Sequence, residues 1–455
     1  MSKPEPPAHV PTAEDSSDGP GEFRPPSIAT GGFEALVARV VVMVSQLAMI
    51  VLTGRFMGPS GRGLYALASL SIGLCQVPFG SVWVANAVEL TKGRATPRQI
   101  FGLSVVIAFA AGLLTSAVAV AISPALGERW WLLALPSLVT PFVLLRAYQE
   151  GLYQALGHVR AVNVLRIGRS TLAVAFIAPP VLADASSRMT IVIWELSFVA
   201  LAITASFRLR RFMGGPQFPR QRAIYSRVLR YGLTISGFRV VEVLNQRNGL
   251  IALAVFASDA TVGVFSIAIA AVEVVLMTTD ALQLSTFRRI GGDARDAAGA
   301  LAVRTTRHCI LLAGGAATIV IPAAYAGIPW VLGEGYGEVP LLLLLLLPSV
   351  LCQAAMRPLY SFFQVQAEQP AVMMRVFGAA LVANVVTNVA LVPHWGSRGA
   401  AVAASLAGIV AIVVAYRAFT AETHVRLADL RPRRRDVLDY VWLVNSLRRR
   451  RARGV

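Results

Sequence analysis

The chain has 455 residues with a net charge of +18; 56% of its residues are hydrophobic, only 15% are charged, and its mean hydropathy is +0.63. A soluble domain is nearer half apolar and about a quarter charged, whereas apolar stretches of about 20 residues, the length that spans a bilayer, fill most of this sequence. The composition therefore argues against a soluble enzyme or a nucleic-acid-binding protein, and it predicts an all-α polytopic membrane protein with about twelve spanning helices in two six-helix bundles.

The chain begins with a segment, residues 1–30, that is rich in Pro, Ser and acidic residues and is predicted to be a disordered cytoplasmic tail. A first six-helix half is predicted over residues 31–207, and its helices are expected near 33–54, 63–90, 99–123, 130–156, 160–183 and 189–207.

A basic cytoplasmic linker is predicted at 208–222, followed by a second six-helix half over 223–420 and a basic tail over 421–455. The helices of the second half are expected near 224–256, 262–287, 299–323, 337–364, 371–393 and 399–420.

The loop charges predict the orientation. If the N-terminus is cytoplasmic, the inner connections carry most of the basic residues, and the outer connections hold mainly Arg55, Arg62, Arg129, Arg188 and Arg398. Because cytoplasmic loops of membrane proteins are enriched in Lys and Arg, this bias predicts a multi-pass protein with both termini inside.

The basic tail contains a short amphipathic stretch at 437–444 between arginine clusters. It is too short to span a bilayer, and two interpretations stay open: a helix lying on the anionic inner leaflet, or a solvated basic tail with little structure.

Motifs of enzymes and metal sites are missing. The sequence has no GxxxxGK[ST], HExxH, GxSxG or SxxK pattern, and its five histidines and three cysteines are scattered without ligand spacing. We therefore expect no catalytic residue, no metal and no cofactor, and a protein that is not an enzyme.

An internal repeat relates the two predicted halves. The turn at 58–68 and the turn at 258–268 align Gly63 with Gly263, Tyr65 with Phe265, and Ala68 with Ala268; a weaker echo relates 153–162 to 363–372. Both echoes occupy equivalent places in a six-helix half. Parallel six-helix repeats are typical of transporters, with the substrate path between the halves.

The turn 54–68, GRFMGPSGRGLYALA, resembles the first hairpin of bacterial oligosaccharide flippases, which belong to the multidrug/oligosaccharidyl-lipid/polysaccharide (MOP) exporter superfamily. The stretch 383–396, ANVVTNVALVPHWG, with 398–401, resembles the turn between helices eleven and twelve of that family. The resemblance extends over roughly residues 33–420.

This resemblance implies a flippase of the bacterial inner membrane that moves a polyprenyl-pyrophosphate-linked oligosaccharide from the inner to the outer leaflet for cell-surface polysaccharide biosynthesis. Its partners would be the lipid-linked oligosaccharide, membrane lipids, and glycosyltransferases and a polymerase of the same pathway. Lipid II flippases of the superfamily usually carry two further C-terminal helices. Only the 437–444 stretch lies there in this chain, which argues against the peptidoglycan precursor as substrate.

Charged residues inside the predicted spans are candidates for the substrate path, because a charge in a bilayer usually faces a cavity or a partner. Guanidinium groups in an inward-open cavity would suit a pyrophosphate. Two other interpretations stay open: arginines near helix ends snorkel to the interface, and Arg146 with Glu150 forms only an intrahelical pair. The candidates are Arg39, Arg146, Glu150, Arg166, Arg239, Glu242, Arg247 and Arg357.

Two further acids, Glu273 and Asp280, stand on one face of a predicted helix. They would either titrate to couple transport to an ion gradient or neutralise Arg239 and Arg247, and neutralisation is favoured slightly. Glu195 is expected at the membrane interface, near the start of helix six.

Two alternatives to the flippase remain. One is a cation-coupled exporter of small molecules or drugs from the same superfamily, which would favour acidic residues in an apolar cavity. The other is a membrane glycosyltransferase or polysaccharide polymerase, which would need catalytic outer loops; the longest predicted outer loop, near 324–336, carries little beyond Glu334 and Tyr336.

Overall fold

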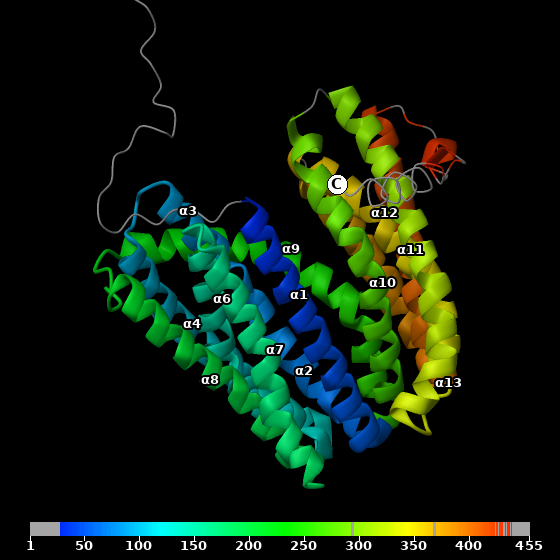
Figure 1. Cartoon of the computed structure of the whole chain (residues 1–455), viewed down its shortest axis with the longest axis horizontal. Coiled ribbons are helices and arrows are strands. Elements are labelled where there is room, and N and C mark those ends of the chain that lie inside the picture. The colour runs from blue at the N-terminus through cyan, green and yellow to red at the C-terminus, as the bar shows by residue number, and fades with distance from the viewer. Residues whose placement is uncertain are drawn as a thin grey trace, which may run out of the picture.

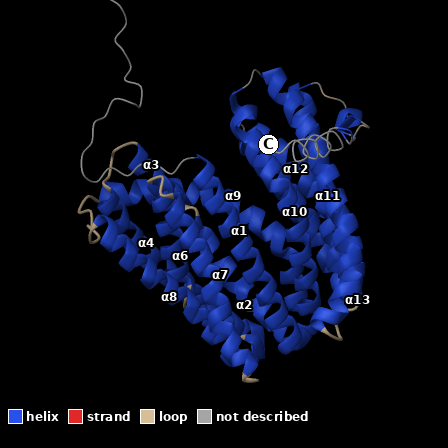
Figure 2. Cartoon of the chain, in the orientation of Figure 1, coloured by secondary structure: helices blue, strands red, loops and turns tan. Residues whose placement is uncertain are grey.

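A computed structural model describes residues 28–423 except 293–294 and 367–369, together with residues 425, 427–430, 433, 435–436 and 438. Every regular element in these residues is a helix, which confirms the predicted all-α fold (Figure 2). Helix α1 begins at Ile28, so the last residues of the predicted disordered tail are helical. The rest of that tail and almost all of the 437–444 stretch lie outside the described residues.

The first half runs from α1 to α8. Its elements are α1 (Ile28–Val51) with a π-helical turn (Leu52–Phe56), α2 (Gly58–Gly80), α3 (Val82–Thr91), α4 (Pro97–Ile122) with a 3₁₀ turn (Ser123–Arg129), α5 (Trp131–Ser137), α6 (Thr140–Ala155), α7 (Val159–Leu182) and α8 (Ser187–Met213).

The second half runs from α9 to α13. Its elements are α9 (Arg222–Phe256), α10 (Asp259–Gly292), α11 (Arg295–Leu332), α12 (Val339–Ser361) with a π-helical turn (Phe362–Gln366), and α13 (Pro370–Thr423), followed by a 3₁₀ turn (Leu427–Leu430).

Local sequence explains several of the helix ends. The start of α4 is a capping box, in which the Gln99 amide donates to Thr96 Oγ1 and the Thr96 amide donates to Gln99 Oε1, and Pro97 occupies the first helical position. Inside the long α13, Gly396 has φ 52°, a left-handed conformation that glycine adopts at little cost, so the chain turns there between two helices.

The described residues are consistent with the predicted count of about twelve helices. Nine helices are long and apolar enough to cross a membrane, and the bent pair α5–α6, with 46° between its parts, makes a tenth. The turn at Gly396 divides α13 into two helices, and the 35-residue α9, which carries Arg239, Glu242 and Arg247, is a further long helix outside this set.

Helix α8 extends to Met213, so Arg208, Arg210 and Arg211 lie on a helix and not in a linker. Helix α9 begins at Arg222, and its first turns pack into the core of the first half through Ile224 and Val228. The two halves are therefore joined by a helix that contacts both.

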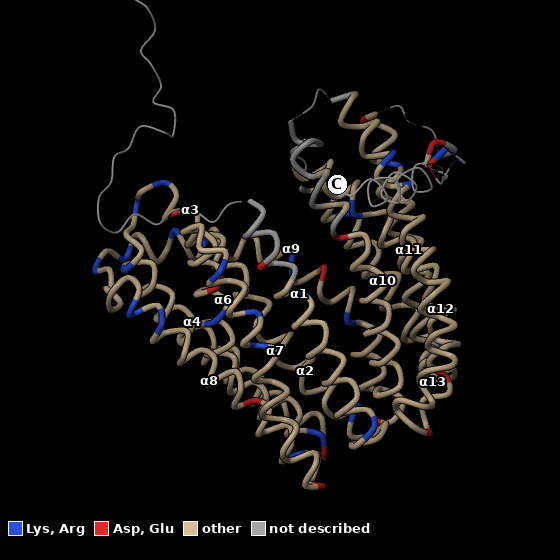
Figure 3. The backbone as a smooth tube through the Cα atoms, in the orientation of Figure 1, with Lys and Arg blue, Asp and Glu red and all other residues tan. Residues whose placement is uncertain are grey.

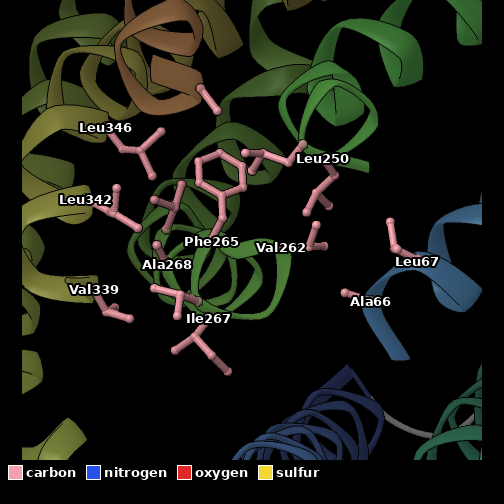
Figure 4. Packing of buried hydrophobic residues seen from close by; sticks show 14 of the residues in the cluster. Ala66, Leu67, Leu250, Val262, Phe265, Ile267, Ala268, Val339, Leu342 and Leu346 are labelled. Atoms are coloured by element: carbon pink, nitrogen blue, oxygen red, sulfur yellow. The ribbon is translucent and has the colours of Figure 1, made fainter. Parts of the chain in front are cut away.

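The two halves meet along α2 and α10, at the glycines that the repeat aligns. A Cβ atom on Gly63 would lie 1.8 Å from the Asp259 carbonyl oxygen, and a Cβ on Gly263 would lie 2.0 Å from the Pro59 carbonyl oxygen. The contacts are reciprocal, as expected for repeats related by a pseudo-two-fold axis. Beside this crossing, a buried cluster contains Leu67 and Phe265, as Figure 4 shows.

Figure 1 shows that the halves meet at the end that holds the α1–α2 and α9–α10 connections and diverge toward the opposite end. We call these the closed end and the open end. At the closed end, Arg129 Nη2 lies 3.1 Å from Asp259 Oδ1, and the Tyr336 hydroxyl donates to the Gly54 carbonyl at 3.0 Å. Arg55 donates to the carbonyls of Trp330 and Val331.

Candidate functional site

A cavity of about 610 Å³ lies between the two halves. Its walls come from α1, α2, α6, α7 and α8 of the first half and from α9 and α10 of the second. This is the place that the internal repeat predicts for a substrate path.

The cavity walls carry five arginines against two glutamates, a net charge of +3. The first half contributes most of this charge. The residues are Arg62, Arg146, Glu150, Arg166 and Arg169 from the first half, and Arg247 and Glu273 from the second.

Glu150 is shared by two arginines. Arg146 Nη1 donates to Glu150 Oε2 at 2.7 Å, one turn away on α6, and Arg166 Nε on α7 donates to Oε1 at 2.9 Å. The intrahelical pair that the spacing of Arg146 and Glu150 suggests is present, and α7 adds a second cation to it. One carboxylate therefore faces two guanidinium groups, which leaves an excess of positive charge at this level.

Arg169 lies one turn beyond Arg166 on α7 and is exposed toward the cavity. Within the described part of the chain, its guanidinium has neither a carboxylate nor a hydrogen-bond partner. It is therefore free to bind an anion.

The second half supplies one pair, in which Arg247 Nη2 on α9 lies 3.4 Å from Glu273 Oε1 on α10. Both side chains are about half exposed, at 41% and 54%. The pair joins the two helices that sequence analysis connected. Whether it serves coupling or neutralisation stays a prediction.

Arg62 is the residue that sequence analysis misplaced. Because the second helix was expected to begin at residue 63, Arg62 was assigned to an outer loop; the structure starts α2 at Gly58 and buries Arg62 at 7% exposure. Its Nε donates to Ser266 Oγ at 3.0 Å and its Nη1 to Thr53 Oγ1 at 2.7 Å, so it bridges the two halves. The proline at position 59, which favours the first turn of a helix, was a signal for the earlier start.

Five predicted residues do not line the cavity. Arg39 is exposed at the middle of α1 and donates to the Met277 carbonyl at 3.5 Å, beside the cavity wall. Arg239 pairs with Glu242 on its own helix at 2.6 Å. Asp280 pairs with Arg357 on α12, not with an arginine of α9, so its expected partner was wrong.

Glu195 is a buried acid of the first half. Its exposure is 4%, and it lies eight residues into α8, about 12 Å along the helix. Its Oε1 is buried and has no hydrogen-bond partner among the described residues, and the residue does not line the cavity.

The open end of the structure is also the basic end. Figure 3 shows Lys and Arg gathered around the α3–α4 and α8–α9 connections, where the halves diverge. The halves thus separate on the side that the charge asymmetry predicts to be cytoplasmic.

Comparison with known proteins shows which solved structures have a similar arrangement of helices. No protein-family model matches the chain, and no curated protein matches it. Among solved structures it is similar to the lipid II flippase MurJ in an inward closed conformation, with a TM-score of 0.63 and 12% identity over 88% of this chain and 89% of that chain.

It is equally similar to an inward-facing multidrug resistance MATE family transporter of the MOP superfamily, with a TM-score of 0.63 and 13% identity over 85% of this chain and 97% of that one. The chain has the fold of the MOP exporters. The predicted resemblance is thereby confirmed for the fold, and at these identities the likeness shows the fold alone.

An outward-facing MATE family transporter of the superfamily gives a lower TM-score of 0.51, with 16% identity over 88% of this chain and 96% of that chain.

Proposed function

We propose that this protein is a flippase that carries a polyprenyl-pyrophosphate-linked oligosaccharide from the inner to the outer leaflet by alternating access. The supporting observation is the net charge of +3 in a cavity between the two halves of a MOP fold. A pyrophosphate carries two or more negative charges, and guanidinium groups bind phosphate oxygens through paired, charge-assisted hydrogen bonds.

The arrangement of the arginines supports an anionic head group over a neutral one. Arg146 and Arg166 divide one carboxylate between them, and Arg169 has none within the described residues. A phosphate that entered from the open end would complete this incomplete set of ion pairs. Without the anion, the arginines repel one another in a site of low dielectric. Binding of the anion relieves this repulsion and is therefore favourable.

The alternative is a cation-coupled exporter of small molecules, since a MATE transporter has the same TM-score as MurJ. An excess of arginine repels organic cations, so the cavity charge favours the flippase. The alternative of a membrane glycosyltransferase or polymerase has no support from the two solved structures with a TM-score of 0.63, which are a flippase and a transporter.

The test is transport in proteoliposomes. Purified protein would be reconstituted with a fluorescent polyprenyl-pyrophosphate oligosaccharide, and translocation followed by the access of a glycosidase added outside. We expect Arg169→Gln to slow translocation by about tenfold or more, since a hydrogen bond to a charged group contributes roughly 1.5–3 kcal/mol. Arg169→Lys should be intermediate because it keeps the charge but loses the planar fork.

The matched control is Arg160→Gln on the same helix, because Arg160 is 80% exposed and outside the cavity. It should transport at the wild-type rate. If the wild type does not move the lipid, or if Arg169→Gln and Arg62→Gln both move it normally, the arginine-lined path for pyrophosphate is wrong.

The proposal also requires a side for each end of the molecule. We infer that the open end and both termini are cytoplasmic, in a bacterial inner membrane. In a cysteine-free background, an impermeant maleimide added outside should label cysteines at positions 187 and 335 and spare those at 93 and 215. The opposite labelling would place the cavity opening in the outer leaflet and contradict the direction of transport.

A further inference from the structure

Three aromatic rings adjoin one another in the cavity wall near the closed end. The Tyr65 ring on α2 lies 4.7 Å from the Trp194 ring on α8, and Trp194 lies 5.1 Å from the Phe198 ring one turn along α8, between ring centroids. All three line the cavity. Trp194 is buried at 4% exposure, whereas Tyr65 and Phe198 are partly exposed, so Phe198 offers ring surface to the cavity and Trp194 packs behind it.

Polar groups adjoin these rings, and the Arg62 guanidinium lies over the Tyr65 ring, 5.2 Å from its centroid. Gln46 on α1 and Ser69 on α2 are exposed side chains in the same cavity wall. Within the described part of the chain, neither side chain has a hydrogen-bond partner, nor does the Tyr65 hydroxyl. Amide and hydroxyl groups that lie next to aromatic surface are suited to a ligand that is rich in hydroxyl groups and has apolar C–H faces.

This patch lies deeper than the arginines of α7. At 1.5 Å per residue, Gln46 is about 8 Å, Tyr65 and Trp194 about 10 Å, and Phe198 and Ser69 about 16 Å from the closed ends of their helices. Arg169 and Arg166 lie about 20 Å and about 24 Å from the closed end of α7. A ligand that enters from the open end therefore meets these arginines before it meets the aromatic patch.

We propose that Tyr65, Trp194 and Phe198, with Gln46 and Ser69, form a subsite for the sugar next to the pyrophosphate. This inference rests on the proposed function, because the order of groups in the ligand is lipid, pyrophosphate, sugar. A phosphate held by Arg166 and Arg169 directs the sugar toward the closed end. There the C–H face of a pyranose packs on the Phe198 ring, and its hydroxyls bond to Gln46, Ser69 and the Tyr65 hydroxyl.

Two lipids that differ by one sugar test this subsite. Undecaprenyl pyrophosphate and undecaprenyl-pyrophosphoryl-N-acetylglucosamine would be titrated against the full chain in nanodiscs, and Kd measured by microscale thermophoresis. We expect the wild type to bind the sugar-bearing lipid about tenfold more tightly, the effect of one ring contact and one or two hydrogen bonds. Phe198→Leu and Tyr65→Phe should each bring this ratio toward one while leaving Kd for undecaprenyl pyrophosphate within about twofold.

Arg169→Gln should act differently, weakening both lipids by the same factor. Phe109→Leu is the matched control: Phe109 contacts Phe142 at 5.5 Å between ring centroids and does not line the cavity, so the ratio should stay at the wild-type value. Tyr65→Phe removes a single oxygen and keeps the ring, so it tests the subsite even if Phe198→Leu does not fold.

The outcomes separate the two proposals. If the wild type binds both lipids equally, the sugar subsite is wrong and the pyrophosphate site stands. If the ratio persists in Tyr65→Phe and Phe198→Leu, the sugar binds elsewhere in the cavity and the subsite is again wrong. If neither lipid binds the wild type, the proposed function fails and the subsite fails with it.

Discussion

The closed end and the cavity differ in the residues that line the boundary between the two halves. At the closed end the halves touch through backbone atoms at Gly63 and Gly263, with few charged pairs around them. In the cavity, arginines and glutamates line the walls, and the guanidinium groups outnumber the carboxylates that could pair with them. Contact between the halves at the closed end therefore depends on close packing, and Gly63 and Gly263 tolerate almost no larger side chain. The cavity carries an excess of positive charge, which an anionic ligand would neutralise.

The largest effect is expected at the glycine crossing. Gly63→Ala places a Cβ atom 1.8 Å from a backbone oxygen that cannot move without shifting α10, so we expect loss of transport and a lower thermal stability. The measurement is thermal unfolding in detergent by fluorescence-detected size exclusion, together with the transport assay.

Gly378→Ala is the control for this change, because Gly378 is also inside a helix and a Cβ there meets nothing within 4 Å. It should be neutral or slightly stabilising, since alanine is the better helix former. Equal stability of the two variants would show that the halves do not cross as closely as described here.

A smaller effect is expected from the Arg247–Glu273 pair. Glu273→Gln leaves Arg247 without its carboxylate, so transport should fall, and adding Arg247→Gln should restore part of it if the pair serves neutralisation. Coupling energy would be taken from the double-mutant cycle of transport rates. A double variant that is no better than Glu273→Gln, with loss of pH dependence in the single variant, would favour ion coupling instead.

The smallest effect is expected from the pair at the closed end, Arg129 and Asp259. Both side chains are partly exposed, and such pairs contribute about 0–1 kcal/mol. Arg129→Gln should therefore shift the balance between inward- and outward-facing states by only about fivefold or less.

Spin labels at positions 126 and 334, on exposed connections of the two halves, would report this shift as a larger fraction of long distances in a pulsed EPR experiment. A complete change to the long distance would mean that the pair, and not the glycine crossing, closes this end.

Sequence reasoning found some of the site because side-chain type and helix spacing are local. Arg146 and Glu150 are one turn apart on one helix, so their contact follows from the spacing alone. It failed for Asp280 of α10, which was expected to pair with an arginine of α9 but lies beside Arg357 of α12. The error on Arg62 came from a helix boundary displaced by a few residues.

The sequence by itself determined that this protein is an all-helical membrane protein of about twelve spans with two repeated halves. Apolar stretches and internal repeats are properties of the sequence that can be found without knowing how the helices pack. It also indicated the glycines of the repeat. Only the tertiary structure decided that those glycines contact each other, that Arg169 is unpaired within the described residues, and that Tyr65 and Phe198 share a wall with it. These features depend on how helices that are far apart in the chain pack together, and the spacing of residues along one helix does not predict that packing.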